Sequence, residues 1–212
     1  MLKRHVLAVA LAAAFAAGTV PPGVVRAAPP ATLSPEDQAL VDKAAAYLDS
    51  LGEAKGTFVQ TDGRGNVSRG EIYLDRPGKA RLEYKAPSSL LIVADGKKVA
   101  VYNPRLQTFN SYPLGSTPLS LFLQKNVRLD QKVVVSNVQR FPGGFRLTAT
   151  DGRHQTLGQI TLDFWDAPMT LKQWSIVDAQ RARTVVQIND LHATSGLDPS
   201  LFELKAPRPP VG

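Results

Sequence analysis

The chain has 212 residues, a length that suits one compact domain. It contains no cysteine, which excludes a disulfide scaffold, a thiolate metal site, a cysteine nucleophile and a lipid-modified N-terminal cysteine. Hydrophobic residues make up 43% and charged residues 20%, so a substantial core is possible, while 16 glycines and 16 prolines favour many short strands and turns over long helices.

The N-terminus has the pattern of a secretory signal peptide. Lys3 and Arg4 precede an apolar, alanine-rich stretch over residues 6–20, and small residues stand three and one positions before a cleavage site after Ala27. The apolar stretch is short for a bilayer span, although a membrane anchor is the alternative interpretation. We therefore predict that residues 1–27 are a signal peptide that is removed on export.

Cleavage after Ala27 would remove Lys3, Arg4 and Arg26 and no acidic residue, so the formal net charge would fall from +7 to +4. No run of five like charges occurs in the chain, and nucleic acid is not expected as a partner. A moderately basic surface would suit anionic lipid headgroups or an acidic protein.

The mature chain is predicted to begin with a flexible, proline-rich leader over residues 28–33, followed by a single domain over residues 34–212. Ser34 can cap a helix and Pro35 suits the first helical position. Apolar residues then recur at three- and four-residue steps, which predicts an amphipathic helix of about 16 residues ending near Gly52.

From residue 56 onward the hydrophobic period changes to two, which predicts strands. Turn residues interrupt the strands at short intervals, as at Asp95-Gly96 and Asn103-Pro104, and indicate hairpins with antiparallel pairing. Residues 117–125 combine a cap, a proline and dense apolar residues, and predict one or two short helices. The fold class is therefore mainly β with a helical cover (α+β), with about ten or eleven strands.

The sequence contains no motif that indicates catalysis, neither a nucleophile elbow nor a dinucleotide-binding glycine motif nor a P-loop. After cleavage, His154 and His192 remain, and neither has a metal-ligand partner at close spacing. His192 stands near Asp190, where a solvated pair is the simpler interpretation and a hydrolase is the alternative. We expect a protein that is not an enzyme and uses no cofactor or metal.

One face of the predicted sheet is apolar, because Ala80, Leu82 and Tyr84 alternate with charged residues. One long helix and one short insertion are little cover for about ten strands. Two outcomes are therefore open. The sheet closes into a filled barrel, or it leaves an apolar hollow under the helices that would bind a lipid-like molecule.

The segment over residues 76–84 reads Arg-Pro-Gly-Lys-Ala-Arg-Leu-Glu-Tyr, and further short segments lie at 58–60, 93–97, 101–104 and 197–202. In this order, they resemble the LolA family of periplasmic outer-membrane lipoprotein carrier proteins, whose strand motif runs Arg-Pro-Gly-Lys-aromatic-Arg-Trp-acid-Tyr. The resemblance covers about residues 34–209, nearly the whole mature chain.

This resemblance implies a strongly curved, incomplete antiparallel β-barrel covered by one long N-terminal helix and short helices near 117–125, with an apolar cavity between. It implies a periplasmic monomer that takes acylated lipoproteins from an inner-membrane lipoprotein-releasing ABC transporter and passes them to an outer-membrane acceptor where one exists. A related sheet-and-lid domain that binds or senses another lipid or glycolipid is the alternative, because Ala80 and Leu82 stand where the family usually has an aromatic residue and tryptophan.

The resemblance also implies a role for Arg76, which matches a family arginine that hydrogen-bonds helix backbone groups and holds the empty lid shut. A solvated arginine at a strand end is the alternative. We expect a set of apolar side chains to line the cavity and the lid, although ordinary core packing would also explain each of them. They are Leu74, Leu82, Tyr84, Leu91, Val93, Val101, Phe109, Leu119, Leu121, Phe122, Ile160, Leu162 and Trp174.

Overall fold

The computed structural model describes residues 33–123, 133–151, 158–178 and 181–206. The chain divides into two compact units, Met1–Pro30 and Ala31–Gly212, and every residue described below belongs to the second. The predicted signal peptide, the predicted leader up to residue 32, and His154 lie outside the described residues. Within the described ranges, no helix has the length and apolar character that a bilayer span requires.

The first element is helix α1, Pro35–Ser50. The side chain of Ser34 accepts a hydrogen bond of 3.1 Å from the backbone N–H of Asp37, which satisfies one of the free donors at the helix start. One face of the helix is buried, namely Leu40, Val41, Ala44, Ala45 and Leu48. This face is the apolar stripe that recurs along the sequence at helical spacing.

Eleven antiparallel strands form one sheet, which confirms a mainly β fold with about ten or eleven strands. The strands are β1 (Glu53–Thr61), β2 (Val67–Asp75), β3 (Lys79–Tyr84), β4 (Leu91–Asp95), β5 (Lys98–Asn103), β6 (Thr108–Pro113), β7 (Val133–Phe141), β8 (Gly144–Asp151), β9 (Gly158–Asp166), β10 (Met169–Asp178) and β11 (Arg183–Ala193). Their order in the sheet is β6-β5-β4-β3-β2-β1-β11-β10-β9-β8-β7, so β6 and β7 are its two edges and the sheet is not closed.

Three short helical elements complete the described fold. The 3₁₀ helix η1, Leu114–Ser116, leads into α2, Leu119–Leu123, which lies in the segment predicted to be helical near 117–125. Residues 124 and 125 lie outside the described ranges. A second 3₁₀ helix, η3, spans Pro199–Phe202, and the carboxylate of Asp198 caps it by accepting from the N–H of Ser200.

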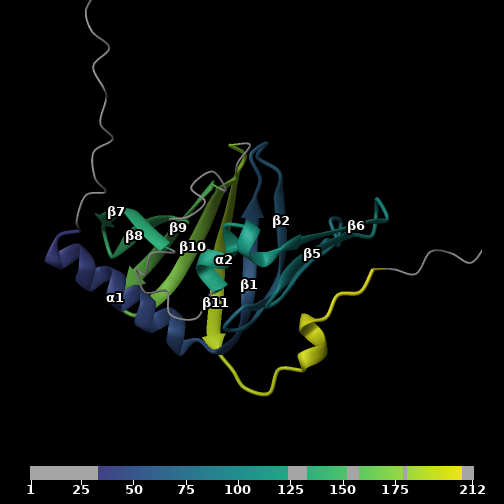
Figure 1. Cartoon of the computed structure of the whole chain (residues 1–212), viewed down its shortest axis with the longest axis horizontal. Coiled ribbons are helices and arrows are strands. Elements are labelled where there is room, and N and C mark those ends of the chain that lie inside the picture. The colour runs from purple at the N-terminus through teal and green to yellow at the C-terminus, as the bar shows by residue number, and fades with distance from the viewer. Residues whose placement is uncertain (1–32, 124–132, 152–157, 179–180, 207–212) are drawn as a thin grey trace, which may run out of the picture. The chain divides into compact units, whose positions relative to one another are not determined.

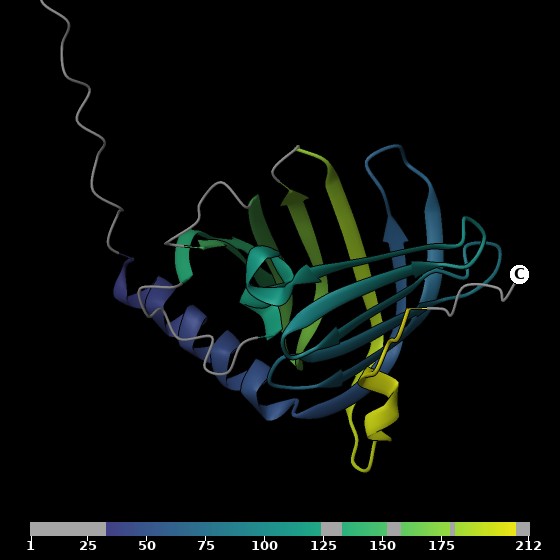
Figure 2. The ribbon, with the colours of Figure 1, turned by 45° about the vertical axis from the view of Figure 1, so that its right-hand side comes forward.

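The two faces of the sheet carry different side chains. We call the face on which α1 and α2 lie the inner face. In register along it, Ile72 pairs with Leu82 and Trp174 pairs with Leu162. Figures 1 and 2 show α1 running across the lower ends of the green strands β8–β10, with α2 in front of the sheet. We call α1 and α2 together the lid, because they cover the apolar inner face.

Candidate functional site

A small apolar cavity of about 20 Å³ lies between the lid and the inner face of β7, β8 and β9. Its wall is made entirely of apolar side chains: Val41, Ala44, Ala45, Leu48, Leu121, Val133, Val135, Leu147, Ala149, Ile160 and Leu162. A cavity of that size has room for about one water molecule. A long acyl chain is therefore far too large for this cavity as α1 and α2 lie in the structure.

Of the side chains expected to line the cavity, the structure places Leu121, Ile160 and Leu162 in its wall. Leu121 comes from α2, whereas Ile160 and Leu162 come from alternate positions of β9 and share one face of that strand. The other walls come from α1, β7 and β8. The cavity is thus assembled from segments that lie far apart along the chain.

A second group of the expected residues lies on the inner face but outside this cavity: Leu74, Leu82, Tyr84, Val101 and Trp174. The ring of Phe122, in α2, stacks on Trp174 with centroids 5.2 Å apart. The hydroxyl of Tyr84 donates to Gln60 at 2.6 Å, and burial raises the pKa of Tyr84 well above its usual value. Leu119, also in α2, is half-buried. These residues extend the apolar inner face toward β5.

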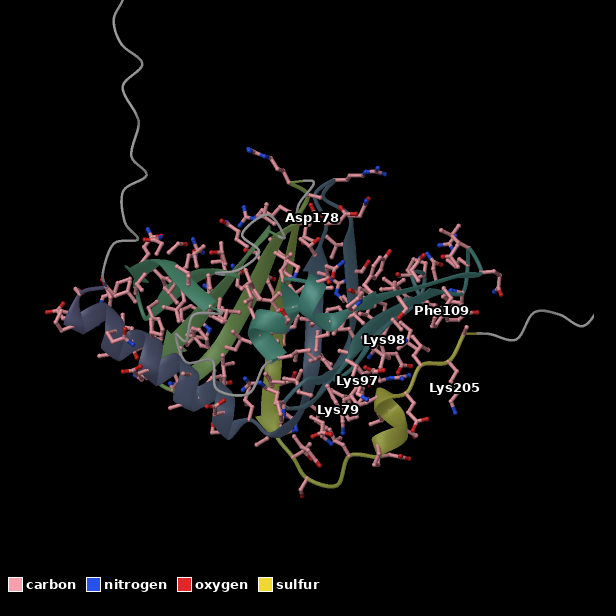
Figure 3. The ribbon with its side chains drawn as sticks, viewed as in Figure 1. Lys79, Lys97, Lys98, Phe109, Asp178 and Lys205 are labelled. Carbon is pink, nitrogen blue, oxygen red and sulfur yellow. The ribbon has the colours of Figure 1, made fainter. Side chains whose placement is uncertain are left out.

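Leu91, Val93 and Phe109 lie on the opposite face of the sheet and do not join the others. In the β3–β4 register, Leu91 pairs with Glu83 and Val93 pairs with Arg81, so both point away from the side that Leu82 occupies. Phe109 pairs with Tyr102 in the β5–β6 hairpin, apart from the lid (Figure 3).

That outer face has its own cover, the 3₁₀ helix η3. The Arg81 guanidinium donates through Nη1 to the backbone oxygen of Leu201 at 3.1 Å. Lys79 Nζ lies 5.8 Å from the centre of the Phe202 ring, and Figure 3 shows Lys79 close to η3. Val93 is consequently buried without facing the lid.

Arg76, in the turn between β2 and β3, is buried with 9% of its surface exposed. Its Nη1 donates to the backbone oxygen of Leu48 in α1 and lies 3.7 Å from a carboxylate oxygen of Asp49. Its guanidinium carbon is 5.9 Å from the centre of the Phe122 ring in α2. Burial lowers the pKa of Arg76, and the Asp49 carboxylate opposes that change.

The same turn also contacts α2 through the backbone. The N–H of Gly78 donates to the carbonyl of Leu123 at 2.7 Å. Gly78 has a φ of +88°, a conformation that glycine adopts without the penalty a side chain would bring. The β2–β3 turn is therefore the one described segment in which we find hydrogen bonds to both helices of the lid.

Asp190 and His192 are not arranged as a catalytic pair. The carboxylate of Asp190 accepts from the backbone N–H and the hydroxyl of Thr57, both at 3.0 Å. His192 Nδ1 instead lies 2.6 Å from the backbone oxygen of Asp190, so the Asp190 carboxylate binds Thr57 and not the imidazole. Among the described residues, no group of three or more histidine, cysteine, aspartate or glutamate side chains is placed to hold a metal ion.

Two residues of α1 that the sequence did not single out also contact the sheet. The hydroxyl of Tyr47 accepts from the backbone N–H of Leu171 in β10 at 3.2 Å, and burial raises the pKa of Tyr47. Lys43 donates to the Asp166 carboxylate at the end of β9. The only signal for them in the sequence is their spacing of one helical turn, which places both on one side of α1.

The chain was compared with known proteins. A family model described as outer membrane lipoprotein carrier protein LolA matches residues 49–205. An outer-membrane lipoprotein carrier protein of Chromohalobacter salexigens is 28% identical over 176 residues, which cover 78% of this chain and 82% of that protein. One of Coxiella burnetii is 26% identical over 165 residues, covering 74% and 77%.

Among solved structures, a LolA-superfamily protein of Nitrosomonas europaea aligns with a TM-score of 0.46 at 11% identity, over 79% of this chain and 97% of that one. The assignment depends on the family model, which spans most of the chain and includes the β2–β3 turn, the inner face and α2. The chain belongs to the LolA family of outer membrane lipoprotein carrier proteins.

Proposed function

We propose that this protein carries lipoproteins across the periplasm and shields their acyl chains between the inner face of the sheet and the lid. It receives them from an inner-membrane ABC transporter and delivers them to the outer membrane, to an acceptor where one is present. The signal-peptide pattern over residues 1–27 supports export to that compartment. The printed names of its relatives support lipoproteins as the cargo.

The need for a carrier follows from the cost of exposing acyl chains to water. Each buried methylene contributes about 0.8 kcal/mol, so one long acyl chain contributes on the order of 10 kcal/mol. A protein with several such chains would not cross an aqueous compartment unaided. The apolar inner face, from Leu82 in β3 to Leu147 in β8, offers the surface that these chains require.

The observation that carries the proposal is the buried Arg76 between the two helices of the lid. A guanidinium has several donors on a rigid fork, which suits backbone oxygens at a helix end. Its bond to Leu48 exists only while α1 is closed, so it stabilises the empty form and opposes loading. Acyl burial drives opening, and reclosing on Arg76 drives release, provided that the two states differ by only a few kcal/mol.

Binding of a lipidated protein by the purified mature chain tests this function. We expect a complex, free of detergent, with an acylated lipoprotein and none with the same protein whose lipid-bearing cysteine is replaced by serine. Equal binding of both forms, or binding of neither, would overturn the proposal. In cells, depletion of the carrier is expected to leave lipoproteins in the inner membrane.

The alternative cargo is another lipid or a glycolipid. Ala80 and Leu82 lie on the inner face of β3, and both are buried, so smaller side chains stand where aromatic residues are usual in the family. A wider space would suit a differently shaped ligand. Mass spectrometry of the lipids that co-purify with the protein from the periplasm separates the two cargoes, because a free lipid appears without an attached polypeptide.

A further inference from the structure

Helix α1 is held to the sheet on a second side, away from Arg76. The hydroxyl of Tyr47 accepts from the backbone N–H of Leu171, and the Tyr47 ring meets Phe164 edge to face, with centroids 6.0 Å apart and planes at 84°. One turn earlier, Lys43 donates to Asp166. Both partners belong to the β9–β10 hairpin, so one side of α1 is fastened to that hairpin.

A β-bulge supplies the donor for Tyr47. Leu171 pairs with Phe164 on β9, but the next pair joins Gln173 to Asp163, so Lys172 is an extra residue on β10. The described pairing of β10 with β11 begins at Gln173 and does not reach Leu171. Leu171 is 2% exposed, and a buried N–H needs an acceptor. Tyr47 provides that acceptor from the helix.

We infer that Tyr47 is a positioning residue that sets how readily α1 leaves the sheet, because its hydroxyl accepts the Leu171 N–H only while α1 is closed. The inference rests on the proposed function, in which α1 must move to admit an acyl chain. A bond present in one of two states shifts the balance between them by its own net free energy. For a neutral hydrogen bond, this shift is about two- to tenfold.

Tyr47→Phe tests the inference, because it removes the hydroxyl and keeps the ring that meets Phe164. In the lipid-free mature protein, we expect the amides of residues 40–50 to exchange with deuterium about two- to tenfold faster, and those of β2 and β3 to exchange as before. We also expect a fluorescent fatty acid to bind more tightly by about the same factor, because the closed state competes less with loading.

Tyr73→Phe is the matched control. It removes a hydroxyl that donates to Glu71 at 2.7 Å, on β2 and away from α1, so exchange in α1 and binding of the fatty acid should stay at wild-type values. A general loss of stability would instead accelerate exchange throughout the sheet and leave the affinity unchanged. That result, or wild-type exchange in α1 of Tyr47→Phe, would overturn the inference.

The exchange measurement contains no lipid, and it therefore separates the inference from the proposed function. Faster exchange confined to α1 in Tyr47→Phe supports the inference whichever ligand the protein carries. Failure of the wild-type protein and of both variants to bind any acylated probe would overturn the proposed function alone.

Discussion

Arg76 donates through Nη1 to the backbone oxygen of Leu48, so a cation in the turn after β2 holds the last turns of α1. The same guanidinium faces the ring of Phe122 in α2. Movement of α1 breaks the first contact, and movement of α2 removes the second. The two helices of the lid thus contact one buried side chain, and the lid opening that we propose would expose its charge.

Replacement of Arg76 by leucine is expected to leave cargo binding intact and to slow release. A hydrogen bond from a charged donor contributes about 1.5–3 kcal/mol, so loss of this closed-state contact favours the loaded form about 10- to 100-fold. The slower release is measured as the rate at which an acylated lipoprotein passes from the purified carrier to acceptor liposomes. Arg76→Lys keeps the charge without the fork, and we expect an intermediate rate. Wild-type transfer by Arg76→Leu would remove Arg76 from the mechanism.

The cavity wall and the outer face should respond differently to added bulk. Ala149→Leu puts extra methyl groups into the wall on β8 and is expected to weaken fatty acid binding, at a cost to stability of about 1–3 kcal/mol. Ala100→Leu makes the same change at a buried alanine on β5, beside Val93 on the outer face, and should leave the affinity unchanged. Equal loss of affinity in both variants would show that the acyl chain does not use this wall.

Gly70 allows the Phe58 ring to lie directly on β2. A Cβ at Gly70 would stand 2.6 Å from the Phe58 ring and 2.3 Å from the backbone oxygen of Glu83, so Gly70→Ala must displace strand backbone. We expect the free energy of unfolding to fall by about 2–4 kcal/mol, measured by urea denaturation. At Gly115 a Cβ would meet nothing within 4 Å, and Gly115→Ala should be nearly neutral. Similar losses in the two variants would contradict this explanation.

Stability is expected to decline in acid because carboxylates at the hairpin turns have lowered pKa values. Hydrogen bonds from Asn66 lower the pKa of Asp62, and backbone N–H groups of Lys98 and Lys97 lower that of Asp95. When the pKa of a carboxylate is lower in the folded protein than in the unfolded chain, ionisation of that carboxylate stabilises the fold. This stabilisation is complete above the unfolded-state pKa and is lost as the pH falls through the folded-state pKa. The loss should therefore begin near pH 4, at about the ordinary pKa of aspartate.

The midpoint of urea unfolding, followed from pH 7 to strong acid, measures this decline. Asp95→Asn removes one of the titrating groups, and its midpoint should depend less on pH than that of the wild type. A slope for Asp95→Asn equal to that of the wild type would refute the assignment.

Much of the strand pattern is predictable because the turns are encoded locally. The Asp95 carboxylate accepts from the N–H groups of Lys97 and Lys98, and the Asn103 amide oxygen accepts from the N–H of Arg105. Such contacts span two or three residues, so the residue types alone identify them. The apolar face of α1 is local in the same sense, and it supplies four of the side chains in the cavity wall.

The faces of β4 could not be assigned from the sequence. Leu91, Ile92, Val93 and Ala94 are all apolar, so no alternation shows which of them point toward the lid. Val93 and Ala94 point to opposite faces and are both buried, and η3 contacts β4, which explains the continuous run. The bond between Tyr47 and Leu171 was equally inaccessible, because it depends on a bulge 124 positions away along the chain.

The β2–β3 turn binds α1 through Arg76 and α2 through Gly78, so in the proposed function the two helices would open together. A bound acyl chain that displaced either helix would disturb the turn that holds the other, which would disfavour forms with only one helix open. A cargo with several acyl chains would then reach the whole apolar inner face in one step, and both helices would close again after its release.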